Sequence, residues 1–344
     1  MANHLIMAID QGGTKTDIII AENNGRIVGA GNDRDWVAVS GERRAVRMLR
    51  IRHAAEKATA DAGIKLSDIN SVSATCIGAD WGFEYETGRN NLRNTLGIEQ
   101  VFLYNDCIGA LRGGTEIKGK DCAVLCLGTG ANCAVINREG REYIYAYYLK
   151  NTHHGAEAIG KFIFQAVFDA ECGLGPESSL TKLLLEKTGC KSVDELLMSV
   201  TTGRTETETP WKPVYQEYCP LLFEAIRAGD RTASEYIQWL CDELARYVIV
   251  AAGKLNMLGR EITVVLSGGV PKSGAIMGDL LQKRFEADLP AFKCLNARFE
   301  PVVGALLLEY DRIYPGGIPM EVTRNIEQSC VDRKLFRIFR TGEA

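Results

Sequence analysis

The chain lacks the features that mark proteins bound to nucleic acids or inserted in membranes. Its 40 lysines and arginines are outnumbered by 44 aspartates and glutamates, so the formal net charge is −4 and there is no basic excess to bind a phosphate backbone. No apolar run is long enough to span a bilayer, and the first residues show no basic stretch followed by a long apolar one. We therefore expect a cytoplasmic protein whose partners include neither a nucleic acid nor a membrane.

Cysteine is present, but not in a pattern that builds a disulfide framework or a metal site. The 11 cysteines are an odd number, and no CxxC pair occurs among them. Cys122, Cys126 and Cys133 lie closest together, and the first two are expected to be small buried side chains of a strand. The alternative for these three is a metal or iron–sulfur site, although they lack the spacing of metal ligands. We expect reduced thiols.

Two nucleotide-binding signatures are also missing. The sequence contains neither GxxxxGK[ST] nor a GxGxxG that opens a helix, which argues against a P-loop and against a dinucleotide-binding fold. What is present is an ordinary globular composition, with 46% hydrophobic and 24% charged residues. A chain of 344 residues with this composition is expected to form two lobes.

One strand–turn–strand pattern occurs twice. Each copy places a turn rich in Gly and Thr between apolar strands and follows it with a hairpin turn that runs from Asn to Gly. Either hairpin alone is typical of any β-meander, but the matched order and turn chemistry indicate two lobes of like design. The strands and turns cover 5–9, 10–16, 18–20 and 23–25 in the first copy, and 123–127, 128–132, 134–136 and 137–140 in the second.

Helices and isolated strands follow each meander, as an α/β lobe requires. The first helix should bury Val46, Leu49 and Ala54. Helices are predicted over 41–62, 156–170, 179–187, 193–200, 215–258 with a break at 228–230, and 301–310; strands are predicted over 71–77, 101–104 and 262–266.

The division between the lobes is placed at the glycine-rich connection 113–120. It gives a first lobe of 1–115, a second lobe of 116–312 and a C-terminal helix or tail of 313–344. The helix over 301–310 is expected to pack back on the first lobe, and a C-terminal helix after about residue 310 is expected to complete that lobe.

Three glycine-containing turns follow apolar strands. Phosphate oxygens bind well to several backbone N–H groups that point one way, and glycine lets the backbone approach closely or adopt positive φ. Two such turns on facing lobes could grip a triphosphate, and the third could lie against a flat adenine. The predicted ATP and phosphate contacts are Gly12, Gly13, Thr14, Lys15 and Thr16 in the first turn, Gly128, Thr129 and Gly130 in the second, and Gly268 and Gly269 in the third.

Two carboxylates lie where these strands end. Asp10 directly precedes the first glycines and can hold Mg²⁺ directly or through water, or else cap the turn. Lys15 can neutralise phosphate charge or lie solvated on the hairpin. Asp106 follows Asn105 at the end of the strand 101–104; alone it suits a helix N-cap, but its place beside the glycine turns favours a general base that accepts a proton from an attacking hydroxyl.

The ordered motifs resemble one known family. DQGGTKTD at 10–17, NDCIGAL at 105–111, LGTGANC at 127–133, AGD at 228–230, LSGGV at 266–270 and PVVGALLL at 301–308 are similar to the BadF/BadG/BcrA/BcrD ATPase family, in particular to its N-acetylglucosamine kinase branch. The resemblance implies two actin-like ATPase (ribonuclease H-like) domains around a central cleft. It further implies ATP and Mg²⁺ as cofactors, and transfer of the γ-phosphoryl group of ATP to a hydroxyl of a hexose or amino sugar.

The same resemblance implies roles for individual residues. Asp10 would hold Mg²⁺, Asp106 would be the catalytic base, and Gly268 and Gly269 would lie near the adenosine. A homodimer is also expected. The candidate contacts to the sugar are Trp36, Gly78, Asp80, Asn105, Asp106, Asn132 and Glu157.

Departures from the family pattern leave the acceptor open. The family's Gly-Asp-Glu-Gly-Ser run is replaced by the segment 154–160, with Ala156 in the place of the aspartate, and Glu157, His153 or His154 could supply the missing contact. Trp81 and Phe83 could stack on a sugar face or pack beneath it. Two alternatives to a kinase remain: an ATPase that activates a partner enzyme, and a sugar-binding regulatory protein without turnover.

Overall fold

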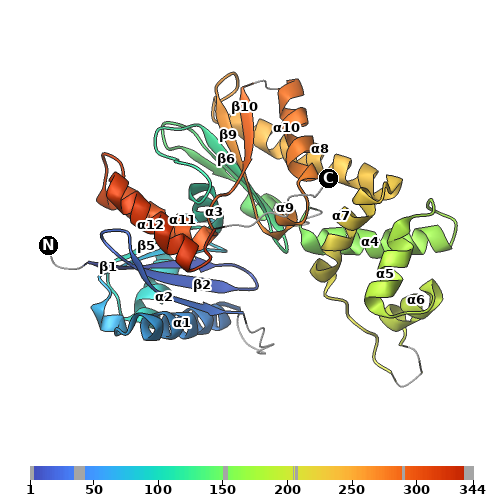
Figure 1. The fold of residues 1–344 in the computed structure, drawn as a ribbon, viewed down its shortest axis with the longest axis horizontal. Coiled ribbons are helices and arrows are strands. Elements are labelled where there is room, and N and C mark those ends of the chain that lie inside the picture. The colour runs from blue at the N-terminus through green and yellow to red at the C-terminus, as the bar shows by residue number, and fades with distance from the viewer. Residues whose placement is uncertain are drawn as a thin grey trace.

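The protein is described from a computed structural model that covers residues 4–34, 43–149, 154–203, 205, 208–288 and 291–336. Two five-stranded mixed sheets form its centre (Figure 1). The first contains β1 (Leu5–Gln11), β2 (Thr16–Glu22), β3 (Ile27–Asp33), β4 (Ser71–Cys76) and β5 (Val101–Asn105). The second contains β6 (Cys122–Leu127), β7 (Ala131–Ile136), β8 (Glu142–Ile144), β9 (Ile262–Ser267) and β10 (Phe292–Asn296).

The two sheets have the same topology. The strand orders are β3-β2-β1-β4-β5 and β8-β7-β6-β9-β10, each with an antiparallel meander followed by two parallel strands. The repeat predicted from the two glycine turns is therefore confirmed, because β1 and β6 occupy the same central place in their sheets.

Both faces of the first sheet are covered. In β1, Met7 and Ile9 face α1 (Arg43–Ala62) and α2 (Gly82–Leu96), whereas Ile6 and Ala8 face α11 (Pro301–Ile313) and α12 (Met320–Asp332). This explains why β1 is apolar at every position from 5 to 9 rather than alternating. The helices lie as layers below and above the sheet in Figure 1.

Helix α1 does not bury all the residues expected of it. Ile51, Ala54 and Ala58 are completely buried against the first sheet, but Leu49 is 50% exposed. The prediction for Leu49 was wrong because the buried face of the helix is set by residues 51, 54, 55 and 58, and Leu49 lies away from that face.

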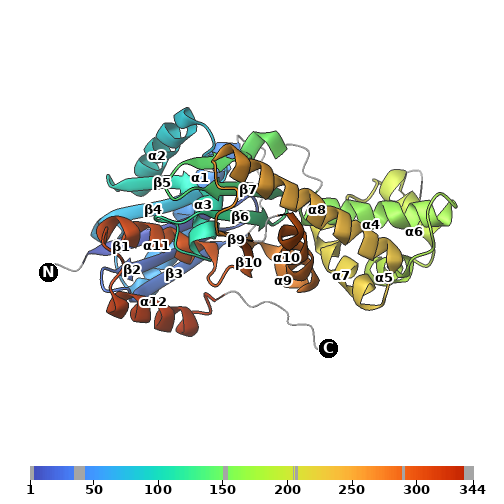
Figure 2. The same cartoon turned by 90° about the horizontal axis from the view of Figure 1, so that it is seen from above.

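The second sheet is covered by α8 (Arg231–Lys254) and α10 (Ile276–Asp288) on one face. The helices α4 (Ala156–Glu171), α5 (Ser179–Thr188), α6 (Val193–Thr201) and α7 (Cys219–Arg227) extend away from it, as Figure 2 shows from above. The break predicted at 228–230 is present, and Asp230 caps α8 by accepting from the N–H of Ala233 at 2.9 Å. A short helix, α9 (Gly269–Ser273), follows β9.

The two halves of the chain exchange one helix. Helix α3 (Asp106–Arg112) follows β5 but packs Leu111 on the free face of the second sheet, whereas α11 follows β10 and packs on the first sheet. The two helices cross in backbone contact, since a Cβ on Gly304 would lie 1.8 Å from the carbonyl oxygen of Gly109. We propose that the first lobe comprises residues up to about 115 together with α11 and α12.

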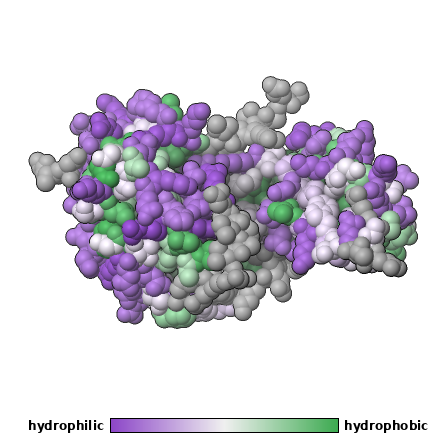
Figure 3. All heavy atoms as spheres, turned by 90° about the horizontal axis from the view of Figure 1, so that it is seen from below, coloured by the Kyte–Doolittle hydropathy of each residue, from purple (hydrophilic) through white to green (hydrophobic). Residues whose placement is uncertain are grey.

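In the described part of the chain, no helix combines the length and apolar character needed to cross a membrane. Hydrophilic side chains prevail on both lobes in the view from below, and the apolar patches there are small and separate (Figure 3).

Candidate functional site

Three carboxylates gather at the carboxyl edge of the first sheet. The parallel strands β1, β4 and β5 align Asp10 with Thr75 and Cys76 with Asn105. Asp10 therefore lies on β1, Asp80 in the loop after β4 and Asp106 directly after β5, where ligands of such sheets bind. The structure brings these three predicted site residues together.

Asp106 is the most perturbed of the three. Burial raises its pKa to about 7, and the negative charges of Asp10 and Asp80 act in the same direction. Asn105 is the N-cap of α3, and its side chain accepts from the N–H of Cys107 at 2.9 Å. Asp106, the first residue of the helix, accepts from the same N–H at 3.0 Å, so a capping contact and a role as base coexist in its carboxylate.

Asp10 is buried beside the first glycine turn. Burial raises its pKa to about 6, Lys15 lowers it, and Asp17 and Glu300 raise it. Lys15 is paired with Asp17 at 2.6 Å, so its ammonium lies between two carboxylates rather than free on the hairpin. Neither Asp17 nor Glu300 was singled out from the sequence.

Glu300 connects the two halves of the site. It precedes α11, its charge acts on Asp10, and its carboxylate pairs with Lys272 of α9 at 2.5 Å. Helix α9 begins at the third glycine turn. The charged groups of Lys272 and Glu300 therefore connect Gly268 of the second lobe to Asp10 of the first.

The loop after β4 is held by two side chains. Asn105, which is buried, donates from Nδ2 to Oδ1 of Asp80 at 2.7 Å. Glu84 accepts at Oε2 from the N–H groups of Asp80 and Trp81, at 3.0 and 2.9 Å. Glu84 was not singled out from the sequence, although an acidic residue three positions after the N-cap residue is a known signal of a helix N-terminus.

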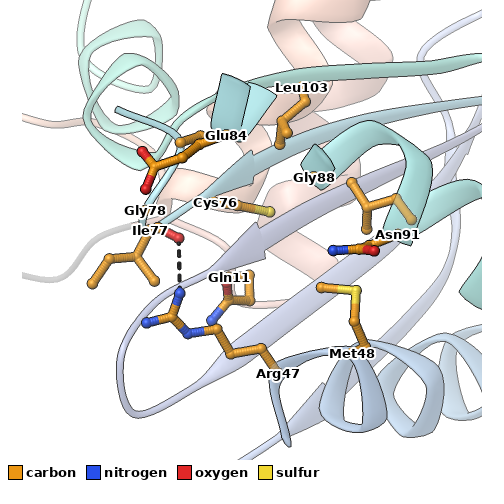
Figure 4. Close-up of a pocket in the computed structure, with 12 residues that line it drawn as sticks. Gln11, Arg47, Met48, Cys76, Ile77, Gly78, Glu84, Gly88, Asn91 and Leu103 are labelled. Carbon is orange, nitrogen blue, oxygen red and sulfur yellow. Dashed lines mark hydrogen bonds between the residues drawn. The ribbon is translucent and has the colours of Figure 1, made fainter. Parts of the chain in front are cut away.

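A cavity of about 50 Å³ lies beneath this loop (Figure 4). Gln11, Arg47, Cys76, Gly78 and Glu84 line it together with apolar side chains of α1, α2 and β5. Beyond the loop, Trp81 is 49% and Phe83 66% exposed. Stacking on a sugar face and packing beneath it both stay predictions for these two residues.

The first two glycine turns are closed by their own backbones. The N–H of Gly12 donates to the carbonyl of Lys15 and that of Gly128 to Gly130, each at 2.9 Å. Gly13 and Thr14 are exposed, but Thr16 is fully buried in β2, so its hydroxyl points into the fold.

Helix α4 docks on the second turn through its backbone. The N–H groups of Ala156 and Glu157 donate to the carbonyls of Gly128 and Thr129 at 2.8 and 3.0 Å. Gly155 makes this possible, because a Cβ there would lie 2.4 Å from the oxygen of Thr129.

The third turn lies beside the second. Strands β6 and β9 are parallel neighbours, and Gly268 has φ +113° with its Cα so close to Leu127 that an added Cβ would lie 2.0 Å from the Leu127 oxygen. Only glycine fits at 268, whereas a Cβ added to Gly269 would meet no atom within 4 Å.

The other residues predicted to contact the sugar differ in their surroundings. The Asn132 side-chain oxygen accepts from the N–H of Ala146 at 3.0 Å, and Glu157, 47% exposed, pairs with Lys161 at 2.6 Å. His154 is buried, its ring is stacked on Trp239, and its Nε2 lies 3.4 Å from the Tyr247 hydroxyl. Trp36 and His153 lie outside the described residues.

The fold and the paired turns define a two-lobed ATPase of the actin-like type. The chain belongs to the BadF/BadG/BcrA/BcrD ATPase family, whose sequence profile matches residues 8–308. The resemblance inferred from the ordered motifs is thereby confirmed, and with it the use of ATP and the α/β class with two actin-like domains.

Individual relatives agree with this placement. The chain is 26% identical over 324 residues to the N-acetyl-D-glucosamine kinase of Dictyostelium discoideum, covering 90% of this chain and 98% of the relative. Among solved structures, a Chromobacterium violaceum protein assigned as an N-acetylglucosamine kinase matches with a TM-score of 0.64 at 21% identity, covering 90% of this chain and 99% of that one. A ROK family glucokinase from Streptomyces griseus, in complex with glucose and AMPPNP, matches with a TM-score of 0.59 at 20% identity, covering 88% and 98%. At these identities the structures show a shared fold.

Proposed function

We propose that this protein is an ATP-dependent sugar kinase that transfers the γ-phosphoryl group to a hydroxyl of a hexose or amino sugar. The observation that carries the proposal is Asp106, a carboxylate at the carboxyl edge of the first sheet whose pKa is raised to about 7 by burial and by two neighbouring carboxylates. The relative named N-acetyl-D-glucosamine kinase supports the acceptor class.

Asp106 acts as the general base in this proposal. An acceptor hydroxyl that donates to its carboxylate would be aligned for attack on the γ-phosphorus, and the proton would pass to Asp106 as the oxygen–phosphorus bond forms. A carboxyl with a pKa near 7 takes up that proton more readily than an ordinary aspartate, while half of it is still ionised at neutral pH.

The acceptor would lie on the loop after β4. Asp80 supplies an acceptor for sugar hydroxyls, and Gly78 allows the ring to approach the backbone. Asn105, also a predicted sugar contact, donates from its amide to Asp80 at 2.7 Å and to the carbonyl of Ala79 at 3.2 Å, so it would act by holding Asp80 in place. Asn132 would contribute its amide NH₂, since its oxygen is bonded to Ala146. Glu157 and Trp36 stay predictions made from the sequence.

ATP would be held by the glycine turns, and Mg²⁺ by Asp10. The donor set fits this ion, because Mg²⁺ is usually bound by one or two carboxylates together with phosphate oxygens and water, and the Asp10 carboxyl is buried among like charges that a cation would relieve. When bound, the ion would offset charge on the β- and γ-phosphates. Gly13, Thr14 and Gly130 would supply backbone N–H groups to the phosphates, whereas the N–H of Gly128 closes its own turn.

Substitution of the base tests the proposal. We expect Asp106→Asn to lower kcat by roughly 10²–10⁴-fold, the usual contribution of a general base, in an ADP-release assay with the best acceptor found among hexoses, amino sugars and N-acetyl sugars. Asp332→Asn, at the distant end of α12, serves as the control. A kcat within a few-fold of wild type in Asp106→Asn would refute the base, and sugar binding without ADP release in wild type would favour a regulatory protein.

A further inference from the structure

Helix α1 is anchored to the first sheet by its C-terminal half. Gly29 and Gly31 of β3 let the backbones meet, since a Cβ at these positions would lie 2.4 Å from the carbonyl oxygen of Ala58 and 2.2 Å from that of Ala54. Any side chain on Gly31 would push the helix away. This half of α1 is therefore fixed relative to the strands that carry the site.

The N-terminal half of α1 carries two arginines, one helical turn apart, that reach two different parts of the site. Arg47 donates from Nη1 to the carbonyl of Ile77 at 3.3 Å, at the start of the loop that contains Gly78 and Asp80 (Figure 4). Arg50 donates from Nη1 to the carbonyl of Gly13 at 3.4 Å, in the first phosphate turn. One rigid helix thus contacts both turns.

Arg47 and Arg50 lie beyond the first turn of α1, where the helix dipole has little effect on a side-chain charge. Arg50 is also almost completely buried, which costs free energy for a charged group. The hydrogen bond to the Gly13 carbonyl offsets part of this cost and ties the buried guanidinium to the phosphate turn.

The cavity beneath the loop shows why Arg47 matters. Because the space under Ile77 and Gly78 is empty of packed side chains, hydrogen bonds fix the loop. Arg47 donates to its first residue, whereas Asn105 and Glu84 bond its end at Asp80. Gly78 has φ +76°, and a Cβ there would lie 3.2 Å from Nη1 of Arg47. The charge of Arg47 also lowers the pKa of Asp80, against the burial and the Glu84 charge that raise it.

We propose that α1 is a strut with two positioning residues, in which Arg47 sets the acceptor loop and Arg50 sets the phosphate turn. The assignment of the two turns to sugar and nucleotide rests on the proposed function. Since each arginine contacts only one of the two carbonyls, the two side chains should affect the two substrates separately.

The test compares three methionine variants of one helix. We expect Arg47→Met to raise the KM for the sugar about tenfold and leave the KM for ATP within twofold, and Arg50→Met to do the reverse, because each loses a charge-assisted hydrogen bond to one turn. Arg52→Met is the matched control: Arg52 bonds Glu56 and the carbonyl of Thr95, away from both turns, so both constants should stay unchanged.

Lysine variants separate positioning from general damage to the fold. Arg47→Lys and Arg50→Lys keep one donor and should recover most of the loss; lysine variants no better than the methionine variants would contradict positioning through these hydrogen bonds. Equal changes of both KM values in either methionine variant, or no change in either, would overturn the proposal. Thermal unfolding of each variant confirms that it is folded.

A failure of the proposed function gives a different result. If wild type releases no ADP with any sugar, the kinase assignment fails, and equilibrium titration with a fluorescent ATP analogue then tests the strut. Weaker nucleotide binding in Arg50→Met but not in Arg47→Met would support the separate action of the two arginines. Equal affinities in both variants would overturn it.

Discussion

The carboxyls of Asp10, Asp80 and Asp106 lie close together at the edge of one sheet, and each has a pKa raised first of all by burial. A carboxyl whose pKa is higher in the folded state than in the unfolded state stabilises the fold while it is protonated. That contribution is present at low pH and is lost as the pH rises through the folded-state pKa, here about 6 for Asp10 and about 7 for Asp106.

Removal of one charge should therefore stabilise the protein at alkaline pH. We expect Asp106→Asn to raise Tm by about 1–2 °C at pH 8, the change that roughly 1 kcal/mol brings in a chain of this size, and by clearly less at pH 5, where Asp106 is protonated in the folded state. Glu171→Gln, at the end of α4, is the exposed control. Equal effects at both pH values would contradict the sign of the pKa shift.

The neighbours of Asp106 should set the pH profile of activity. Because the charge of Asp80 raises the pKa of Asp106, Asp80→Asn should move the acidic limb of log kcat/KM to lower pH, in addition to weakening the acceptor contact. The measurement is kcat/KM between pH 5 and 9. A limb at the wild-type position would show that Asp80 does not act on the base.

At the scale of single elements, α3 and α11 cross with too little space between their backbones for a side chain at Gly304. A methyl group on Gly304 would lie 1.8 Å from the Gly109 oxygen, and overpacking of this kind costs about 1–3 kcal/mol or more. We expect Gly304→Ala to lower Tm by several degrees. Gly316→Ala is the matched control, since a Cβ there meets nothing within 4 Å.

The elements were predictable where their signals are local. The glycine turns at 12–16 and 128–130, the break at 228–230 and the strand ends next to Asp10 and Asp106 follow from turn chemistry and short apolar runs. Contributions from distant elements were not predictable from the sequence. Glu300 reaches Asp10 from the start of α11, and Arg47 and Arg50 reach the turns from the side of a helix whose buried face was itself misplaced at Leu49.

At the scale of the whole molecule, nucleotide binding should stabilise both lobes together. A ligand at 100 times its Kd adds about 2.7 kcal/mol to the free energy of unfolding, so ATP with Mg²⁺ should raise Tm by about 3–5 °C in a single cooperative transition. In Asp10→Asn the part of this shift that depends on Mg²⁺ should disappear. A shift of the same size with and without Mg²⁺ in wild type would contradict the role of Asp10.

The duplication was visible in the sequence, but the exchange of helices was not. Strand order follows from the repeated meander, whereas nothing in the composition of α3 or α11 shows that each covers the sheet of the other half. The apolar residues of either helix would suit either sheet, and the choice is made by tertiary packing.

The exchanged helix also imposes an order on biosynthesis. Ile6 and Ala8 of the first strand are covered by Val302, Val303 and Leu306, almost 300 residues later in the chain. At a synthesis rate of about 5–20 residues per second, α11 is synthesised roughly 15–60 s after the strand whose apolar face it covers. The N-terminal sheet is therefore made first and finished last, which gives chaperones a defined apolar surface to protect until the last helices leave the ribosome.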